Sequence, residues 1–122
     1  MAKESNVTVG KIGEEIARDY LQKKGYKILE QNYRTKFGEI DLVAKDGKEL
    51  VFVEVRTKTG EDFGTPEESL NYRKLQKIWL NARAYAAIHK WQGPCRIDAV
   101  CIVLRQAEHK VPERVDHYQG II

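Results

Sequence analysis

The spacing of hydrophobic residues divides the chain into helical and extended segments. Apolar residues recur every three or four positions over residues 7–24 and again over residues 67–90, which predicts two amphipathic helices. Residues 26–34, 39–45 and 48–57 tend to alternate instead, and residues 96–104 are almost continuously apolar, so each is expected to form a strand. Residues 115–118 are a candidate edge strand, and residues 1–6 a candidate flexible tail.

The order of these segments predicts the fold class. A helix is followed by three strands, a second helix and a further strand. Because the second helix connects strands 48–57 and 96–104, these two strands are expected to be parallel, whereas the hairpin strands are antiparallel. We therefore expect an α/β domain (an α+β mixed sheet) with helices packed against it, and a single domain over residues 1–122.

An unusual group of charges lies in the predicted hairpin of residues 38–58. A tight turn at Asp46-Gly47 would place Glu39 directly across from Glu54, with Asp41 diagonal to Glu54 on the same face. Like charges in this position destabilise a sheet, and buried carboxylates are costly unless they are paired or bind a cation. A cluster of oxygen ligands suits a hard cation such as Mg²⁺ or Mn²⁺.

The alternative for this hairpin is a solvent-exposed face on which basic residues neutralise the acids. Arg56 and Lys58 share that face with Glu54 and are available for this purpose. Apolar neighbours on the same face, such as Phe52, favour a half-buried acid cluster over full exposure.

Two further acids have open alternatives. Glu14 lies at the edge of the apolar stripe of the first helix, as either a solvated first-turn acid or one that leans toward the acidic hairpin face. Asp98 interrupts the apolar strand 96–104, and we interpret it first as a strand-end charge that pairs with Arg96 or with a helix lysine.

Composition and charge narrow the classes of partner. The formal net charge of +3 permits nucleic-acid binding, and Arg73, Lys74 and Lys77 in the second helix are candidate phosphate contacts. No apolar stretch approaches a membrane span, and the N-terminus lacks the apolar core of a signal peptide, so a cytoplasmic protein without a membrane partner is expected. Cys95 and Cys101 lie too far apart on one strand to bridge each other.

These patterns resemble the restriction-endonuclease-like PD-(D/E)xK nuclease superfamily, and more closely the small bacterial YraN-type proteins, a family of predicted endonucleases. The residues that carry the resemblance are Gly13-Glu14, Gly25-Tyr26, Asn32 with Arg34, Gly38-Glu39-Ile40-Asp41-Leu42, Phe52-Val53-Glu54-Val55, Phe63-Gly64, Lys74 and Asp98. They extend over most of the chain, and the combination of GEIDL with FVEV at this spacing is its most specific part.

The resemblance implies a restriction-endonuclease-like core and Mg²⁺- or Mn²⁺-dependent hydrolysis of phosphodiester bonds in DNA, with branched or single-stranded DNA as candidate substrates. It implies that Asp41 and Glu54 hold the metal together with the backbone carbonyl of Val55. Glu14 would match an additional helix acid of resolvase-like relatives, and Glu39 would support the site from beside the ligands. Because resolvase-like relatives act as dimers, a homodimer is a further expectation, and Arg34 joins the candidate DNA contacts.

The chain departs from this pattern two residues after Glu54, where the superfamily has a lysine and this sequence has Arg56. Arginine stays protonated and cannot act as a base, although it can bind a phosphate oxygen. Lys58 lies on the same face but about 7 Å further along the strand. The sequence therefore leaves three functions open: a nuclease that uses Asp41, Glu54, Arg56 and Lys58, a nucleic-acid-binding module without catalysis, and a protein-interaction domain.

Overall fold

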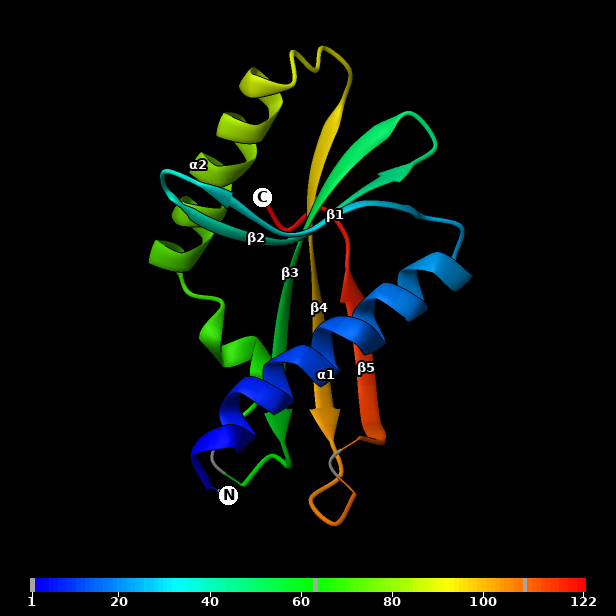
Figure 1. Cartoon of the computed structure of the whole chain (residues 1–122), viewed down its shortest axis with the longest axis vertical. Coiled ribbons are helices and arrows are strands. Elements are labelled where there is room, and N and C mark those ends of the chain that lie inside the picture. The colour runs from blue at the N-terminus through cyan, green and yellow to red at the C-terminus, as the bar shows by residue number, and fades with distance from the viewer. Residues whose placement is uncertain (1, 63, 109) are drawn as a thin grey trace.

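The structure, a computed structural model, describes residues 2–62, 64–108 and 110–122. In chain order its elements are α1 (Ala2–Lys23), β1 (Lys27–Thr35), β2 (Gly38–Asp46), β3 (Glu49–Thr59), the 3₁₀ helix η1 (Pro66–Ser69), α2 (Tyr72–Ile88), β4 (Cys95–Leu104) and β5 (Pro112–Tyr118) (Figure 1). Phe63, which carries part of the resemblance, lies outside the described residues.

A five-stranded sheet in the order β1-β2-β3-β4-β5 forms the centre of the fold. Strands β3 and β4 are parallel and all other neighbours are antiparallel, which confirms the predicted mixed sheet and the predicted edge strand near the C-terminus. One core cluster lies between the sheet and α1, and a second lies between the sheet and α2. Within the described residues, neither helix combines the length and the apolar character that crossing a membrane requires.

Helix α1 ends where the sequence predicts. Gly25 has a φ of 97°, a conformation that favours glycine, and its N–H donates to the carbonyl of Gln22. The N–H of Tyr26 donates to the carbonyl of Leu21, which completes a Schellman motif. Tyr26 and Leu21 are both buried in the core cluster beneath α1, so the end of this helix is also part of the core.

The beginning of α1 and the span of the second helix correct the sequence-based predictions. Helix α1 begins at Ala2, inside the segment predicted as a tail, where Ala2, Lys3 and Glu4 have favourable helix propensities and no proline interrupts the helix. The single helix predicted over residues 67–90 is divided into η1 and α2. Asn71 separates them because its side chain accepts a hydrogen bond from the N–H of Lys74 at 2.9 Å and so caps α2.

The register of the central hairpin differs from the prediction by two residues. Gly47 and Lys48 form the turn, with Gly47 at a φ of 62°, so Asp46 pairs with Glu49. This positive φ at the first turn position matches a type II′ turn, which glycine favours. A shift of two residues leaves Val43 and Phe52 on a common face, as predicted, but it removes the predicted pairing of Glu39 with Glu54. Ile40, predicted to share a face with Leu42, packs instead with Val43 in the core cluster beneath α2.

Gly13 allows α1 to pass unusually close to β3. A Cβ atom at this position would lie 1.9 Å from Oγ1 of Thr57 and 2.8 Å from its Cβ. Only a residue without a side chain fits this crossing, and Glu14 is consequently carried against the sheet.

We expect Gly13→Ala to lower the free energy of unfolding by about 1–3 kcal/mol through overpacking, although alanine favours a helix by about 1 kcal/mol. Urea denaturation measures the change. Gly10→Ala is the matched control on the same helix, because no atom lies within 4 Å of its added Cβ, and it is expected to stabilise by about 0.5–1 kcal/mol. Similar effects of the two substitutions would contradict the close crossing.

Candidate functional site

The candidate site lies where β2 separates from β3. The ladder between these strands ends at the pair Leu42 and Val53. Beyond it the Asp41 side chain takes the place of a backbone acceptor, since its Oδ2 accepts a hydrogen bond of 2.8 Å from the N–H of Val55. The N–H and C=O of one residue in a strand point toward the same neighbour, so the Val55 carbonyl is also directed toward the gap beside Asp41.

Glu54 is the buried acid of the site, with only 6% of its surface exposed. Its Oε2 lies 3.3 Å from Nη1 of Arg56 and 3.4 Å from Nζ of Lys74, which extends from the first turn of α2. The Arg56 guanidinium is also held from behind, because its Nε donates to Oγ of Ser69 at 2.7 Å. Two cations from different elements therefore converge on one carboxylate.

The electrostatics of the site are unfavourable to a second anion. Burial, the negative charge of Glu54 and that of Glu14 raise the pKa of Asp41 to about 7, while the hydrogen bond from Val55 and the charge of Lys74 oppose the shift. Arg56 and Lys74 both form ion pairs with Glu54. Among the described residues, Asp41 has one hydrogen-bond donor, the backbone N–H of Val55. An added cation would relieve this repulsion.

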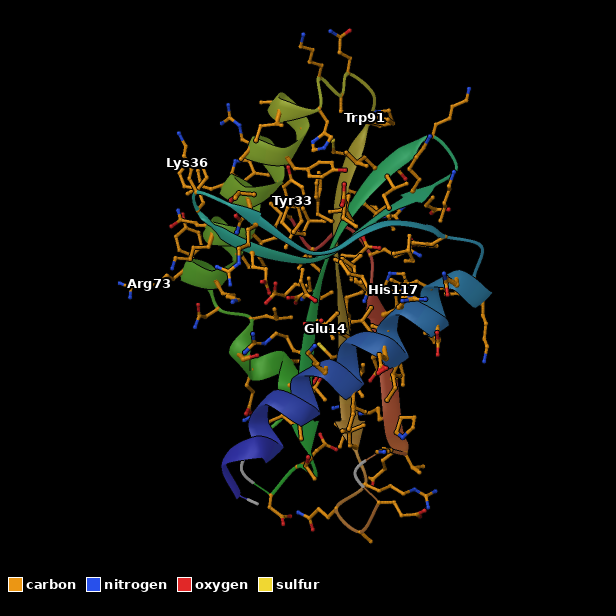
Figure 2. All side chains as sticks on the ribbon, viewed as in Figure 1. Glu14, Tyr33, Lys36, Arg73, Trp91 and His117 are labelled. Atoms are coloured by element: carbon orange, nitrogen blue, oxygen red, sulfur yellow. The ribbon has the colours of Figure 1, made fainter. Side chains whose placement is uncertain are left out.

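Glu14 approaches the same region from α1, where that helix crosses the sheet (Figure 2). Asn32 joins it to Glu39, because its Nδ2 donates to Oε1 of Glu14 at 2.9 Å and to Oε1 of Glu39 at 3.3 Å. Burial is the main cause that raises the pKa of Glu14, and the charges of Glu39 and Glu54 add to it. The inward orientation is thus the one the structure adopts, and Glu39 lies beside Glu14 rather than across from Glu54.

The predicted basic residues divide into two groups. Asp41 and Glu54 form the acid pair of the site, and Lys74 contacts it through Glu54. Arg56 also contacts Glu54, as its position on the strand implies. Lys58, expected as a possible substitute base, is exposed further along β3. Arg73 and Lys77 are exposed on α2, where Figure 2 shows Arg73 extending from the helix.

Arg34 approaches Glu39 from β1, the strand that pairs with β2. Its side chain is 87% exposed and its Nε lies 4.0 Å from Oε2 of Glu39. This position leaves its guanidinium accessible at the outer rim of the site.

Asp98 belongs to a separate network on the α1 side of the sheet. Arg96 Nε donates to it at 2.8 Å, His117 Nε2 lies 2.7 Å away and the N–H of Gly120 donates at 3.0 Å. Burial opposes ionisation here, but the contacts with His117, Arg96 and Gly120 outweigh it and lower the pKa of Asp98. The predicted pairing with Arg96 is confirmed, and this acid ties the C-terminal segment to the sheet.

The site offers oxygen donors from two carboxylates and one strand carbonyl. Among the described residues, no group of three or more His, Cys, Asp or Glu side chains is arranged to hold a metal ion. Mg²⁺ is commonly bound through one or two carboxylates, with waters and substrate phosphate completing its shell. The Asp41 and Glu54 pair fits that type of donor set.

Asn32 and Ser69 are the residues whose roles sequence reasoning missed. Asn32 has a φ of 50°, and asparagine is one of the few residues besides glycine that adopts this conformation readily. An asparagine at an isolated break in a strand pattern is a signal that could have marked it. Ser69 carries no comparable signal, because its contact with Arg56 depends on how η1 folds back onto β3.

Comparisons with known proteins identify relatives across most of the chain. The family model described as "Uncharacterised protein family UPF0102" matches residues 13–102. A UPF0102 protein of Thermodesulfovibrio yellowstonii is 47% identical over 105 residues, which cover 86% of this chain and 94% of the relative. One of Thermotoga maritima is 46% identical over 111 residues, covering 91% and 94%, and one of Caldanaerobacter subterraneus is 45% identical over 118 residues, covering 96% of both.

We expect Asp41→Asn to stabilise the protein in the absence of divalent cations. Because the pKa of Asp41 rises from 3.8 to about 7 on folding, the folded state holds a proton that the unfolded state loses between these values. Stability contributed by this group therefore falls as pH increases from about 4 to 7, and the penalty persists above pH 7. Asparagine removes the penalty while keeping an acceptor for Val55.

Urea denaturation in EDTA should show a gain of about 1–3 kcal/mol for Asp41→Asn at pH 8 and a smaller gain at pH 5. Asp19→Asn, an exposed acid on α1, serves as the control and should change stability little at either pH. A loss of stability in Asp41→Asn at pH 8 would refute the unfavourable burial of this carboxylate.

Proposed function

We propose that this chain, which belongs to the uncharacterised protein family UPF0102, is a divalent-metal-dependent nuclease that hydrolyses phosphodiester bonds in DNA. The observation that carries the proposal is the convergence of Asp41 and Glu54 at the break between β2 and β3, with Lys74 and Arg56 beside them. Carboxylates that repel each other in a partly buried site, next to cations that suit a phosphate, form an arrangement typical of phosphoryl-transfer chemistry. The superfamily resemblance points to the same activity.

The carboxylates of Asp41 and Glu54, with the carbonyl of Val55, would hold Mg²⁺ or Mn²⁺. When bound, such an ion stabilises the charge that develops on the scissile phosphate and lowers the pKa of the attacking water. Glu14 lies beside these proposed ligands, and a hydrogen bond from Asn32 holds its carboxylate in place. Glu39, held by the same amide, orients Asn32 and so supports Glu14.

Arg56 and Lys74 take different roles at the phosphate. Arg56 remains protonated and is fixed by Ser69, so it binds a phosphate oxygen and offsets transition-state charge. Lys74 supplies the compact ammonium group that the superfamily pattern expects from the strand, here delivered from α2. Lys74 would thus provide the ammonium group that Arg56 does not, and the exposed Lys58 would not be needed for this role.

Helix α2 would supply the surrounding DNA contacts. No Asp or Glu occurs between Leu70 and Ile97, whereas this segment contains several Lys and Arg residues. Arg73 and Lys77 would neutralise phosphates beside the scissile bond, and Arg34 would do so from the β1 side.

A nucleic-acid-binding module without catalysis is the second candidate. The ion pairs that Glu54 makes with Arg56 and Lys74 favour it, because they satisfy this carboxylate without a metal. This candidate predicts salt-sensitive DNA binding without DNA cleavage, whether Mg²⁺ or Mn²⁺ is added.

Cleavage of single-stranded, duplex, flap and four-way-junction DNA with Mg²⁺ or Mn²⁺ tests the nuclease. Asp41→Asn and Glu54→Gln are each expected to reduce the rate by about 100-fold or more, because each removes a charge that holds the metal. Glu15→Gln, an exposed acid next to Glu14 in sequence, is the matched control and should retain activity. The nuclease proposal fails if no substrate is cut, or if cleavage survives both carboxylate substitutions.

The lysine assignment has its own test. Lys74→Ala should lower kcat by about 10²–10⁴-fold with a small change in KM, as expected for a group that acts in the transition state. Lys77→Ala, from the exposed face of the same helix, should instead raise KM. Equal effects of the two substitutions on KM alone would show that Lys74 only contributes to DNA binding.

A further inference from the structure

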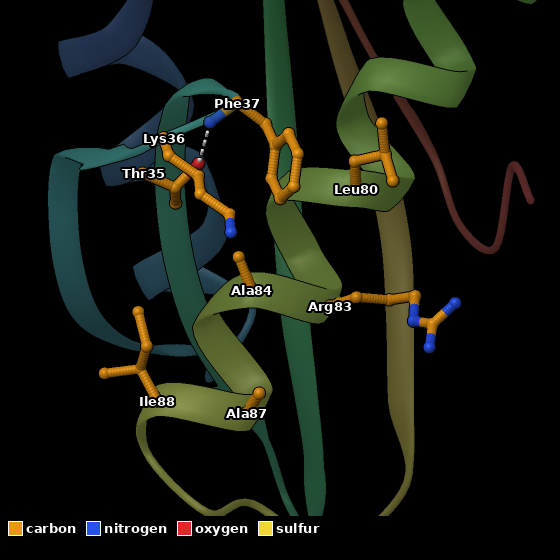
Figure 3. A pocket seen from close by; sticks show the side chains of 8 residues that line it. All are labelled: Thr35, Lys36, Phe37, Leu80, Arg83, Ala84, Ala87 and Ile88. Atoms are coloured by element: carbon orange, nitrogen blue, oxygen red, sulfur yellow. Dashed lines mark hydrogen bonds between the residues drawn. The ribbon is translucent and has the colours of Figure 1, made fainter.

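A groove between the β1–β2 hairpin and the outer face of α2 lies apart from the acid pair. Its volume is about 540 Å³, and Figure 3 shows the side chains that line it. Phe37 at the hairpin tip forms one wall, and Leu80 and Ile88 of α2 contribute to the other. Lys36 and Arg83 also line the groove, so its apolar walls are accompanied by a cation from each side.

The hairpin tip is fixed against the helix, so the groove exists before any ligand arrives. Thr35 Oγ1 donates a hydrogen bond to Oδ1 of Asn81, a buried residue of α2. The same hydroxyl accepts a hydrogen bond of 3.0 Å from the N–H of Phe37. Gly38, which follows Phe37, has a φ of 134°, a backbone conformation that favours glycine at the end of this turn.

The aromatic residues near the groove remain exposed and are accompanied by cations. Phe37 is 38% exposed, and Nζ of Lys36 lies 5.3 Å from the centre of its ring. Trp79 is an exposed residue of α2 next to Leu80 in sequence, and the guanidinium of Arg83 lies 6.0 Å from the centre of its ring. Exposed aromatic faces interleaved with basic side chains are characteristic of surfaces that bind single-stranded nucleic acid.

The positive charge around the groove favours a negatively charged polymer as its ligand. Neither Lys36 nor Arg83 lies within 4.0 Å of a carboxylate among the described residues. The two segments that build the walls, residues 31–38 and 70–97, contain no Asp or Glu. A second copy of the chain is disfavoured, because a two-fold interface would place this basic patch against itself.

We propose that this groove binds an unpaired base of a DNA strand, with the base stacked on Phe37 and the adjoining phosphates contacted by Lys36 and Arg83. Bases in a duplex are stacked and present only their edges, so a ring face is available to Phe37 only where a nucleotide is unpaired. The inference rests on the proposed nuclease function and specifies its substrate class as DNA with single-stranded segments.

Helix α2 relates this groove to the acid pair. Lys74 contacts Glu54, and Ala84 in the groove wall follows ten residues later on the same helix. At 1.5 Å per residue the two points lie about 15 Å apart along the helix axis, a distance that a few nucleotides span. The bound base would therefore lie a few nucleotides from the scissile phosphate.

Binding measured in EDTA tests the groove without cleavage. Fluorescence anisotropy with a single strand of about 20 thymidines and with a blunt duplex of equal length should show tighter binding of the single strand. Phe37→Ala should weaken single-strand binding by about 5- to 150-fold, as expected for the loss of one stacked base, and change duplex binding by less than about 2-fold. Phe37→Trp, which keeps an aromatic face, should bind near the wild-type level.

Leu29→Ala is the matched control, because Leu29 is also a 38% exposed apolar residue of the β1–β2 region but does not line this groove. It should leave both affinities unchanged. As an independent readout, 2-aminopurine scanned along the strand should show a protein-dependent fluorescence change that Phe37→Leu abolishes, since leucine keeps the apolar contact without the ring. Analytical ultracentrifugation of wild type and Phe37→Ala measures self-association.

Equal affinity for single strand and duplex, or single-strand binding that Phe37→Ala does not weaken, would overturn the groove assignment. A dimer that Phe37→Ala dissociates, with DNA binding unchanged, would assign the surface to a second copy instead. The binding and cleavage experiments separate the two proposals. If the protein prefers single strands but cleaves no DNA, only the nuclease activity is refuted. If it cleaves DNA without preferring single strands, only the groove assignment is refuted.

Discussion

The hydrogen bond from the Val55 N–H to the Asp41 carboxylate is the contact on which the candidate site depends. A side chain here occupies the position that the backbone of β2 would take if the ladder continued beyond Leu42. The substitution lets the two strands separate without leaving this buried donor unsatisfied. It also brings a carboxylate to within interaction distance of Glu54, so the break in the sheet and the acid pair are one structural feature.

This arrangement places a local cost at the centre of an otherwise well-packed domain. The strands around the site are buried on both faces, and the two core clusters enclose them. Asp41 cannot ionise easily in that setting, because burial and Glu54 both raise its pKa. The core supplies enough stabilisation to hold an unfavourable charge pair, which is the condition typical of sites shaped by function rather than by stability.

Helix α2 combines three tasks on different faces. Ile78, Ala82 and Tyr85 pack into the core and fix the helix on the sheet. Lys74 in its first turn reaches Glu54, while the outer face carries the basic and aromatic residues beside the hairpin groove. Asn81 anchors the hairpin between these regions, so the spacing between the acid pair and the groove is set by a rigid element.

Periodicity and helix-end signals were sufficient to predict the mixed sheet and the parallel crossover. Alternation and helical spacing are repeated within each segment, and a helix that connects two strands of one sheet favours a parallel, right-handed connection. The turn at Gly47 and the cap at Asn71 shifted boundaries by a few positions, as local alternatives of similar energy compete there. Only the tertiary structure decided that Lys74 meets Glu54, that Asn32 joins Glu14 to Glu39, and that Phe37 faces α2. These contacts join elements distant in sequence, and their geometry follows from strand separation and helix packing, which no local pattern encodes.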